Sequence, residues 1–448
     1  MKKFILSIAL PSALQGMITV AMSFIDTLML GSLTESSIAA ASLASQPVFV
    51  FTVVHFGLSG GSSVLTAQFW GSKDVESLKK TMGLMYRISA VISMGFFGVC
   101  QLAGARILGV MSSDPEVQAL GLIYLHTVSW GFLFQGVTLC TMAVLRSVRT
   151  VRIAVVTSMG ACVFNVVGNY LLIYGHGGFP ALGVRGAAIA TMAARVAECL
   201  IGVGYLLVFE KKIRFRISDL WKSSREIRKK FLENSALVIA NESIWSLGMS
   251  LFMVIIGQLG TAAVTAYSVS QVLIQLAETF VSGIGYAAGV MSGNLIGAGK
   301  RQEAQRSAEQ FIRISVLLGI GVGLLIWFGR FPYLAVYRIS GETKQLAGQI
   351  LKILAVQSFF QTIYFVNMMG TLRGGGDTRF VLCTDILFLW CVSLPFGYLF
   401  GIRLQAPVWL VVLALKSEGV FKSLIALARI KRKRWIHNLT VEPSNTEQ

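Results

Sequence analysis

The sequence predicts an all-α membrane protein with twelve transmembrane helices in two pseudo-symmetric six-helix bundles. Of its 448 residues, 54% are hydrophobic and only 13% are charged, and the mean hydropathy of +0.69 lies well outside the range of soluble domains. Long apolar stretches recur along the whole chain, and features of its first half return in the second. These two patterns leave no room for a separate soluble domain.

A helix needs about 20 mostly apolar residues to cross the hydrocarbon core of a bilayer. The first candidate follows Met1-Lys2-Lys3 and starts like a signal peptide, but its apolar run continues to about Leu30 without a convincing cleavage site. We therefore interpret it as a membrane helix. The twelve predicted helices lie at residues 4–30, 38–70, 83–108, 118–145, 152–174, 184–209, 235–257, 262–296, 309–330, 346–372, 380–400 and 407–428.

The connections between these helices are short except for 210–234, which contains nine Lys and Arg residues. Its amphipathic spacing suits a helix that lies on the membrane surface. We expect this basic linker to separate an N-terminal bundle (1–209) from a C-terminal bundle (235–430). A cytoplasmic tail at 431–448 follows, and its polar residues 435–448 are expected to be disordered.

The distribution of charge predicts the orientation. The chain has 39 Lys and Arg against 21 Asp and Glu, a formal charge of +18. In a soluble protein this excess would suggest a nucleic-acid partner, but in a membrane protein it collects in cytoplasmic loops. Alternate loops, beginning with the N-terminus, carry 27 Lys and Arg residues, and the opposite loops and their edges carry six. We therefore expect a multi-pass protein of the plasma membrane, the inner membrane of a bacterial cell, with both termini cytoplasmic and no nucleic-acid partner.

The two halves of the chain are related by an internal repeat. Because each half has six helices, an even number, the repeats share one orientation and are related by an axis along the membrane normal. This architecture is typical of transporters in which one bundle rocks against the other. A shift of 226 residues aligns Gly31 with Gly257, Ala40 with Ala266, Ser42 with Ser268, Gly57 with Gly283, and Gly71 with Gly297.

Neither the cysteines nor the histidines form a catalytic or metal-binding pattern. The six cysteines fall in apolar stretches without CxxC spacing, and the four histidines are scattered. The sequence has no HExxH or P-loop motif. We therefore expect no enzyme activity and no cofactor, and we expect no ATP-driven transport unless a separate subunit supplies the ATPase.

Several motifs, in both halves, resemble the multidrug and toxic compound extrusion (MATE) family. They are Asp26-Thr-Leu-Met-Leu-Gly31, the turns at Gly71 and Gly297-Ala-Gly-Lys300, the stretch Gly178-Phe-Pro-Ala-Leu-Gly183-Val-Arg-Gly-Ala-Ala-Ile-Ala-Thr191, and Leu372-Arg-Gly-Gly-Gly-Asp377-Thr. The resemblance implies a secondary antiporter that exports organic cations or other amphipathic compounds in exchange for sodium ions or protons. Its partners would be these small molecules and membrane lipids, and we expect a monomer.

The alternative is a flippase for lipid-linked precursors, since related two-bundle folds perform that task. A flippase would be expected to hold anionic pyrophosphate with several basic residues in its cavity. Only Arg195, Lys352 and Lys416 lie well inside the predicted helices, so the sequence favours the exporter.

The resemblance also implies an ion-coupling site in the N-terminal bundle. Asp26 matches the family's helix 1 acid, and Asn165 and Asn169 match ion-site positions, the second of which is often Asp in relatives. Asn165 and Asn169 are spaced i, i+4 and share a helix face. With the Thr191 hydroxyl they offer hard oxygen ligands, so Asp26, Asn165 and Asn169 are our candidate sodium ligands. The alternative is that these polar groups only bond between helices.

Other charged residues inside predicted helices need an explanation, because charge in a bilayer is costly. Glu242 is a further candidate for ion coupling, although the functional acid that some relatives carry in this helix lies about one turn away. A second family acid, expected near Thr362, is absent from this sequence. Among the remaining charged residues, we expect Arg195 and Glu198 to pair with each other. We expect Lys416, Glu418 and Lys422 either to pair or to snorkel to the membrane interface. Glu278 and Asp385 are intramembrane acids without an assigned role.

A site for flat lipophilic cations needs adaptable apolar walls and a few polar contacts. Gln46 in the second helix and Tyr267 and Gln271 in the eighth are our candidate substrate-binding residues.

Overall fold

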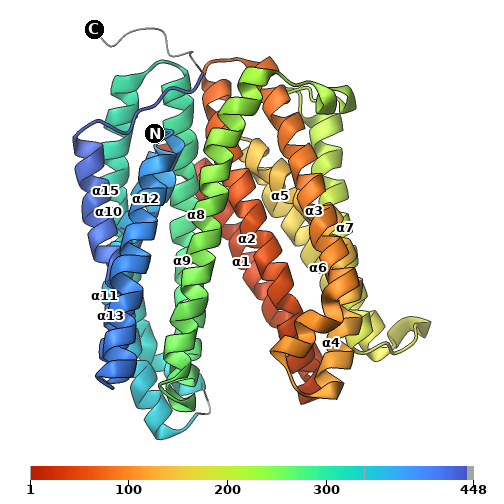
Figure 1. Cartoon of the computed structure of the whole chain (residues 1–448). Coiled ribbons are helices and arrows are strands. Elements are labelled where there is room, and N and C mark those ends of the chain that lie inside the picture. The colour runs from red at the N-terminus through yellow and green to blue at the C-terminus, as the bar shows by residue number, and fades with distance from the viewer. Residues whose placement is uncertain (1, 338, 441–448) are drawn as a thin grey trace. The chain divides into compact units, whose positions relative to one another are not determined.

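The computed structural model describes residues 2–337 and 339–440, which form helices joined by turns and contain no strand (Figure 1). Within this part of the chain, eleven helices are long and apolar enough to cross a membrane. The predicted twelfth helix is divided at Ser417 into two shorter ones. The helices are α1 Lys2–Gly31, α2 Glu35–Gly71, α3 Val75–Met111, α4 Pro115–Val128, α5 Phe132–Ser147, α6 Arg152–Tyr174, α7 Val184–Gly204, α8 Arg225–Gly257, α9 Thr261–Gly297, α10 Arg301–Val336, α11 Gly341–Tyr364, α12 Thr378–Phe388, α13 Leu394–Tyr398, α14 Val408–Lys416 and α15 Glu418–Lys431.

Local sequence explains where several helices begin and end. Asp74 caps α3 by accepting a hydrogen bond from the Ser77 backbone N–H at 2.9 Å, and Asp114 caps α4, where Pro115 occupies the first helical position. Both residues satisfy N–H groups that the helix itself leaves free. Gly175 ends α6 in the left-handed conformation (φ 75°), which costs a glycine little.

The chain divides into two compact units. The N-terminal unit comprises residues 14–66 and 74–235, and the C-terminal unit comprises the described residues within 1–13, 67–73 and 236–448. Each half of the chain therefore lends the start of its first helix to the other unit, which differs from the division at 209 and 235 that we expected. Close backbone packing accompanies the exchange: a Cβ at Gly283 would lie 2.5 Å from the Ala9 carbonyl oxygen, and one at Gly61 would lie 2.5 Å from the Ser235 Cα.

The repeat is visible in the helix bounds and in a reciprocal contact. The helices α2 and α9 begin and end with the same offset of 226 residues. In the C-terminal unit the end of α9 crosses the end of α2 so closely that a Cβ at Gly71 would lie 2.1 Å from the Asn294 carbonyl oxygen, and one at Gly297 would lie 1.9 Å from that of Gln68. Gln68 and Asn294 are themselves related by the same offset, so the contact is symmetric.

We expect Gly297→Ala to lower the free energy of unfolding by about 1–3 kcal/mol, because the new methyl group has to push the α2 backbone away. The matched control is Gly321→Ala in α10, where an added Cβ has no neighbour within 4 Å. Thermal unfolding of the purified variants in detergent measures both. Equal melting temperatures for the two variants would contradict the close crossing.

The basic linker does not form the surface helix that we expected. Residues 217–221 form a short 3₁₀ helix, and α8 already begins at Arg225. Asp219 holds the linker to α3, because its carboxylate lies 3.5 Å from Lys79 Nζ and 2.8 Å from Lys222 Nζ. The amphipathic pattern therefore belongs partly to the first turns of α8.

The chain after α15 is ordered up to residue 440, which corrects our expectation of disorder from residue 435. Trp435 is fully buried, and its indole N–H donates to Gln305 Oε1 at 2.9 Å. Both polar atoms of the Gln68 side-chain amide bind the same segment. Its Nε2 donates to the His437 carbonyl at 3.0 Å, and its Oε1 accepts from the Leu439 N–H at 2.8 Å. The expectation of disorder rested on the polar composition of this segment, but the burial of Trp435 anchors it. Residues 441–448 lie outside the described residues.

Asp377 anchors this segment and the turn before α12. Arg429 donates to its two carboxylate oxygens at 2.8 and 3.2 Å, and His437 Nε2 lies 3.5 Å away. Burial by itself opposes ionisation of the carboxyl group, but the hydrogen bonds from His437 and Arg429 outweigh it, and the pKa of Asp377 lies below its usual value.

A lowered pKa stabilises the folded state above the unfolded value of about 3.9, and this contribution is lost as the pH falls through the folded-state pKa. At neutral pH we therefore expect Asp377→Asn to melt below the native protein, with the gap closing below about pH 4. Melting curves of the two proteins between pH 7 and pH 3 measure this. A gap that stays constant over that range would show that the Asp377 charge does not contribute.

Candidate ion-coupling site

The four predicted residues of the N-terminal unit form one connected hydrogen-bond chain. Asn169 Nδ2, on α6, donates to Asp26 Oδ1 on α1 at 2.5 Å and approaches Asn165 Oδ1 at 3.4 Å. Asn165 Nδ2 in turn approaches Thr191 Oγ1 on α7 at 3.4 Å. Three helices thus bring together a carboxylate, two amides and a hydroxyl, the four residues that the resemblance indicated.

The Asn169 side chain leaves one oxygen free at the centre of this group. Both asparagines are fully buried, and Asp26 is half-buried. Asn169 has to present its NH₂ group to the carboxylate, which leaves its Oδ1 buried without a hydrogen-bond donor among the described residues. A buried oxygen without a partner costs roughly 1–3 kcal/mol. A cation bound beside Asp26 would satisfy it.

Small residues allow α7 to approach α6 closely enough for Thr191 to reach Asn165. A Cβ at Gly186 would lie 2.4 Å from the Leu172 carbonyl oxygen, and one at Gly168 would lie 2.9 Å from the Ala190 side chain. The stretch from Gly183 to Thr191 therefore acts through its lack of bulk, as small residues do between membrane helices.

Two further residues complete the surroundings of the site. The Tyr124 ring, on α4, is buried, and its side chain interacts with that of Thr191. Arg195 lies one turn after Thr191 and interacts electrostatically with Asp26, while its guanidinium pairs with Glu198 at 3.1 Å. The sequence predicted the Arg195–Glu198 pair from its i, i+3 spacing, but it carried no signal for Tyr124, which depends on how α4 packs.

Glu242 does not join this group. It belongs to the C-terminal unit, where its carboxylate Oε1 lies 2.9 Å from Arg373 Nη2. Its charge is therefore already compensated, whereas no Lys or Arg among the described residues lies within ion-pair distance of Asp26. The prediction that Glu242 takes part in ion coupling has no support from this arrangement.

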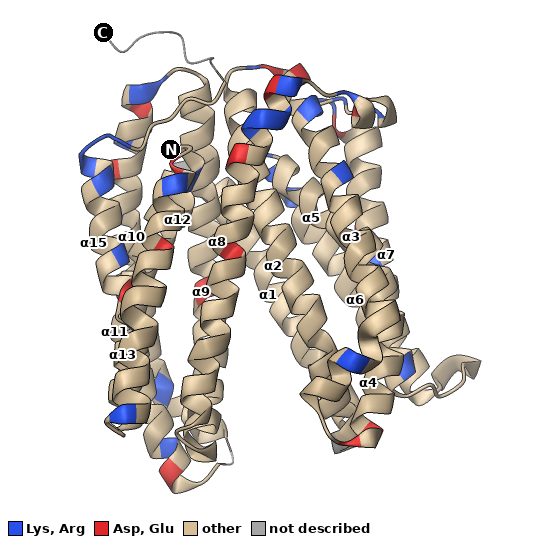
Figure 2. Ribbon diagram, viewed as in Figure 1, with Lys and Arg blue, Asp and Glu red and all other residues tan. Residues whose placement is uncertain are grey.

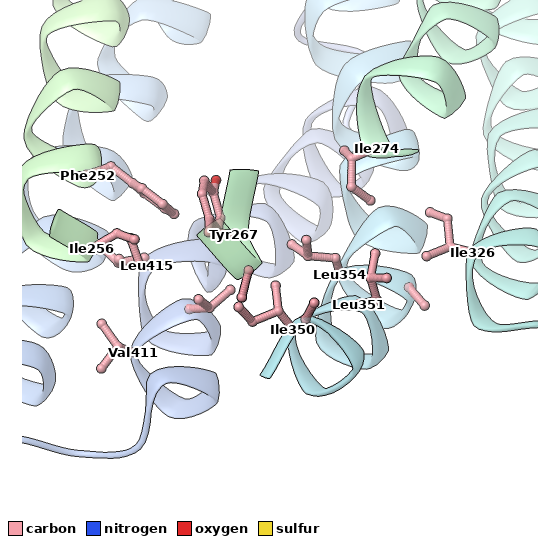
Figure 3. Close-up of a cluster of buried hydrophobic side chains, with 14 of the residues drawn as sticks. Phe252, Ile256, Tyr267, Ile274, Ile326, Ile350, Leu351, Leu354, Val411 and Leu415 are labelled. Carbon is pink, nitrogen blue, oxygen red and sulfur yellow. The ribbon is translucent and has the colours of Figure 1, made fainter. Parts of the chain in front are cut away.

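The three candidate substrate residues lie in different surroundings. Gln46 is exposed on α2 in the N-terminal unit, and Gln271 is half-buried on α9 in the C-terminal unit. Tyr267 is only 1% exposed and its ring lies 5.3 Å from that of Phe252, within the apolar cluster of that unit (Figure 3). A substrate could reach Tyr267 only if this cluster opened, so Tyr267 is a poor candidate in this conformation.

The comparison with known proteins agrees with this architecture. The sequence matches the family described as MatE over residues 11–171 and 236–399, one block in each half. The chain belongs to this family. MATE proteins are transport proteins rather than enzymes, and the long apolar helices make this member a multi-pass membrane protein.

Relatives cover nearly the whole chain at low identity. An uncharacterized transporter, YisQ, of Bacillus subtilis is 22% identical over 92% of this chain and 90% of its own. A probable multidrug resistance protein NorM of Synechocystis is 26% identical over 90% and 89%, and one of Bradyrhizobium diazoefficiens is 25% identical over 88% and 85%.

Two solved structures share the fold. A crystal structure of MATE in complex with MaL6 superimposes with a TM-score of 0.87 at 18% identity and covers 97% of both chains. An outward-facing multidrug resistance MATE family transporter of the MOP superfamily gives 0.86 at 19% identity over 97% of this chain and 96% of its own.

Proposed function

We propose that this protein is a secondary antiporter that exports organic cations or other amphipathic compounds in exchange for sodium ions or protons. The observation that carries the proposal is the Asp26 group, in which the carboxylate accepts from the Asn169 NH₂ group and the Asn169 Oδ1 is buried without a donor among the described residues. Family membership and the names of the multidrug resistance relatives support the choice of cargo. None of the relatives and structures named above is described as a lipid flippase, so the comparisons do not support that alternative.

The chemistry of the site suits a small monovalent cation. Carboxylate, amide and hydroxyl oxygens are hard donors, which hard cations such as sodium prefer. A proton would bind Asp26 itself, since the side chains of asparagine and threonine do not take up a proton near neutral pH. All four side chains come from a single unit of one chain, so the site needs no partner subunit, and we expect the protein to work as a monomer.

We further propose that both termini lie in the cytoplasm. Figure 2 shows that, within the N-terminal unit, Lys and Arg residues concentrate near the start of α3 and around the basic linker. Excess positive charge in short loops marks the cytoplasmic side of a membrane protein. The protein would then lie in the plasma membrane and release its cargo outward.

Ion and substrate would act on one equilibrium between two states of the transporter. A ligand shifts such an equilibrium only by the difference between its affinities for the two states. Loading of the Asp26 site from outside would favour the state that releases substrate outward, and loss of the ion to the cytoplasm would reset the protein.

Retention of a fluorescent lipophilic cation in efflux-deficient bacteria tests this function. Cells that express the native protein are compared with cells that carry the empty vector, each with and without external sodium at fixed pH. We expect lower retention with the protein, and a dependence on sodium would identify sodium as the coupling ion. Lower retention that ignores sodium but disappears when a protonophore collapses the proton gradient would identify protons. Equal retention in both strains would contradict the proposal.

Asn169→Asp is expected to increase the dependence of export on pH. The new carboxylate would contact that of Asp26, and two adjacent carboxylates hold one proton between them rather than ionise together. Export rates of the native protein and the variant between pH 6 and pH 8.5 measure the change, with Asn438→Asp, outside the transmembrane helices, as the control. An unchanged pH profile would show that Asn169 does not share the ion with Asp26.

A further inference from the structure

The C-terminal unit contains a buried lysine that is held by two carboxylates. The Lys422 side chain, on α15, is 2% exposed, and its Nζ lies 3.0 Å from Asp385 Oδ1 on α12 and 3.0 Å from Glu418 Oε2, one turn earlier on α15. Lysine is almost never fully buried unless it is paired. Our expectation that Lys422 would pair along its own helix was therefore correct but incomplete, because Asp385 is a second partner, and snorkelling is excluded by its burial.

The Asp385 carboxylate has three partners among the described residues. Besides Lys422, it accepts hydrogen bonds from the Tyr364 hydroxyl at 2.8 Å and from Asn241 Nδ2 at 3.0 Å. The Tyr364 ring adds a π face, whose centre lies 5.2 Å from Lys422 Nζ. The ammonium group thus sits among carboxylate oxygens and an aromatic ring, which are the groups that attract a cation.

A second observation also points to cation binding. Asn241 is 3% exposed, and its Oδ1 accepts no hydrogen bond from the described residues, although its NH₂ group is bound to Asp385. The group therefore contains a free buried amide oxygen beside a carboxylate, as does the Asp26 group with Asn169.

The two groups differ in how their charge is compensated. At Asp385 and Glu418 the chain provides an ammonium within ion-pair distance of both carboxylates. At Asp26 the nearby Arg195 is paired with Glu198, and no Lys or Arg among the described residues lies within ion-pair distance of the Asp26 carboxylate. Burial of an uncompensated charge is costly. The Asp26 carboxylate therefore has no cation of the described chain in direct contact, whereas Asp385 and Glu418 share the Lys422 ammonium.

We propose that Asp385, Glu418, Tyr364 and Asn241 form a monovalent-cation site that the chain keeps filled with the Lys422 ammonium. The part of this inference that concerns coupling rests on the proposed function: ion exchange is then confined to the Asp26 site, with one exchangeable ion per chain. Replacement of the lysine by a neutral side chain opens the second site to a sodium ion or a proton.

Binding of radioactive sodium to the purified protein tests the site itself. At pH 8.5, where carboxylates are least protonated, we expect Lys422→Met to bind one more sodium ion per chain than the native protein. The additional ion should disappear in the Lys422→Met/Asp385→Asn double variant. The control is Lys300→Met, which removes an exposed lysine that lies 2.9 Å from Glu303; it should gain no ion. If Lys422→Met gains none either, and its melting temperature depends on neither sodium nor pH between 5 and 8.5, the proposal is wrong.

A second measurement does not require Lys422→Met to fold. With Lys422 in place, Asp26→Asn is expected to bind no sodium, and residual saturable binding that Asp385→Asn removes would overturn the proposal. The Asp26→Asn/Lys422→Met double variant separates the two hypotheses. Sodium binding in this variant that depends on Asp385 supports the second site even if Asp26 proves not to be the coupling residue.

Discussion

Asp26→Asn is expected to abolish most ion-coupled export while leaving the protein folded. The substitution keeps the size of the side chain but removes the only formal negative charge in the hydrogen-bond chain with Asn165, Asn169 and Thr191. Loss of a charged ligand costs about 1.5–3 kcal/mol, or roughly ten- to a hundredfold in ion affinity. Retention of the fluorescent cation and sodium binding measure the two consequences.

Asp114→Asn is the matched control for this experiment. Asp114 is exposed at the start of α4 and acts as a helix cap, a role that asparagine fills as well. It should export like the native protein. Normal export by Asp26→Asn, at equal amounts of protein in the membrane, would remove Asp26 from the mechanism and leave the fold assignment unaffected.

Asp385→Ala is expected to cause the largest loss of stability. It leaves the Lys422 ammonium buried with a single carboxylate and removes the acceptor for Tyr364 and Asn241. Removal of one partner from a buried ion pair costs about 3–5 kcal/mol. A lower melting temperature and a lower yield of folded protein in detergent would both report this loss.

Two comparisons show whether the loss comes from the ion pair. The Asp385→Ala/Lys422→Met double variant should lose less stability than the sum of the losses of the two single variants, because each single variant already removes the interaction between the two residues. Glu303→Ala, which breaks the exposed pair with Lys300, should cost at most about 1 kcal/mol. If the losses of the two single variants simply added up in the Asp385→Ala/Lys422→Met double variant, the ion pair would not be the source of the effect.

Local sequence was sufficient for the helices and for the repeat, and the resemblance to MATE proteins indicated the residues of the candidate site. A run of apolar residues forms a helix in a bilayer because a helix satisfies its own backbone groups there, so eleven of the twelve predicted segments are long helices or parts of them, α2 and α9 among them. Helical periodicity also placed Asn165 and Asn169 on one face and paired Arg195 with Glu198, since these relations lie within a single helix.

Tertiary structure alone decided which faces meet. Periodicity gives the direction of a side chain but not the neighbour it encounters, so neither the Asp385–Lys422 pair, which joins α12 to α15, nor the contact of Tyr124 with Thr191 was predicted. The same reason explains Trp435, whose burial depends on Gln305 130 residues earlier in the chain. The charge of an acid in a membrane protein is compensated by whichever helix packs against it, and the chain's local pattern does not contain that information.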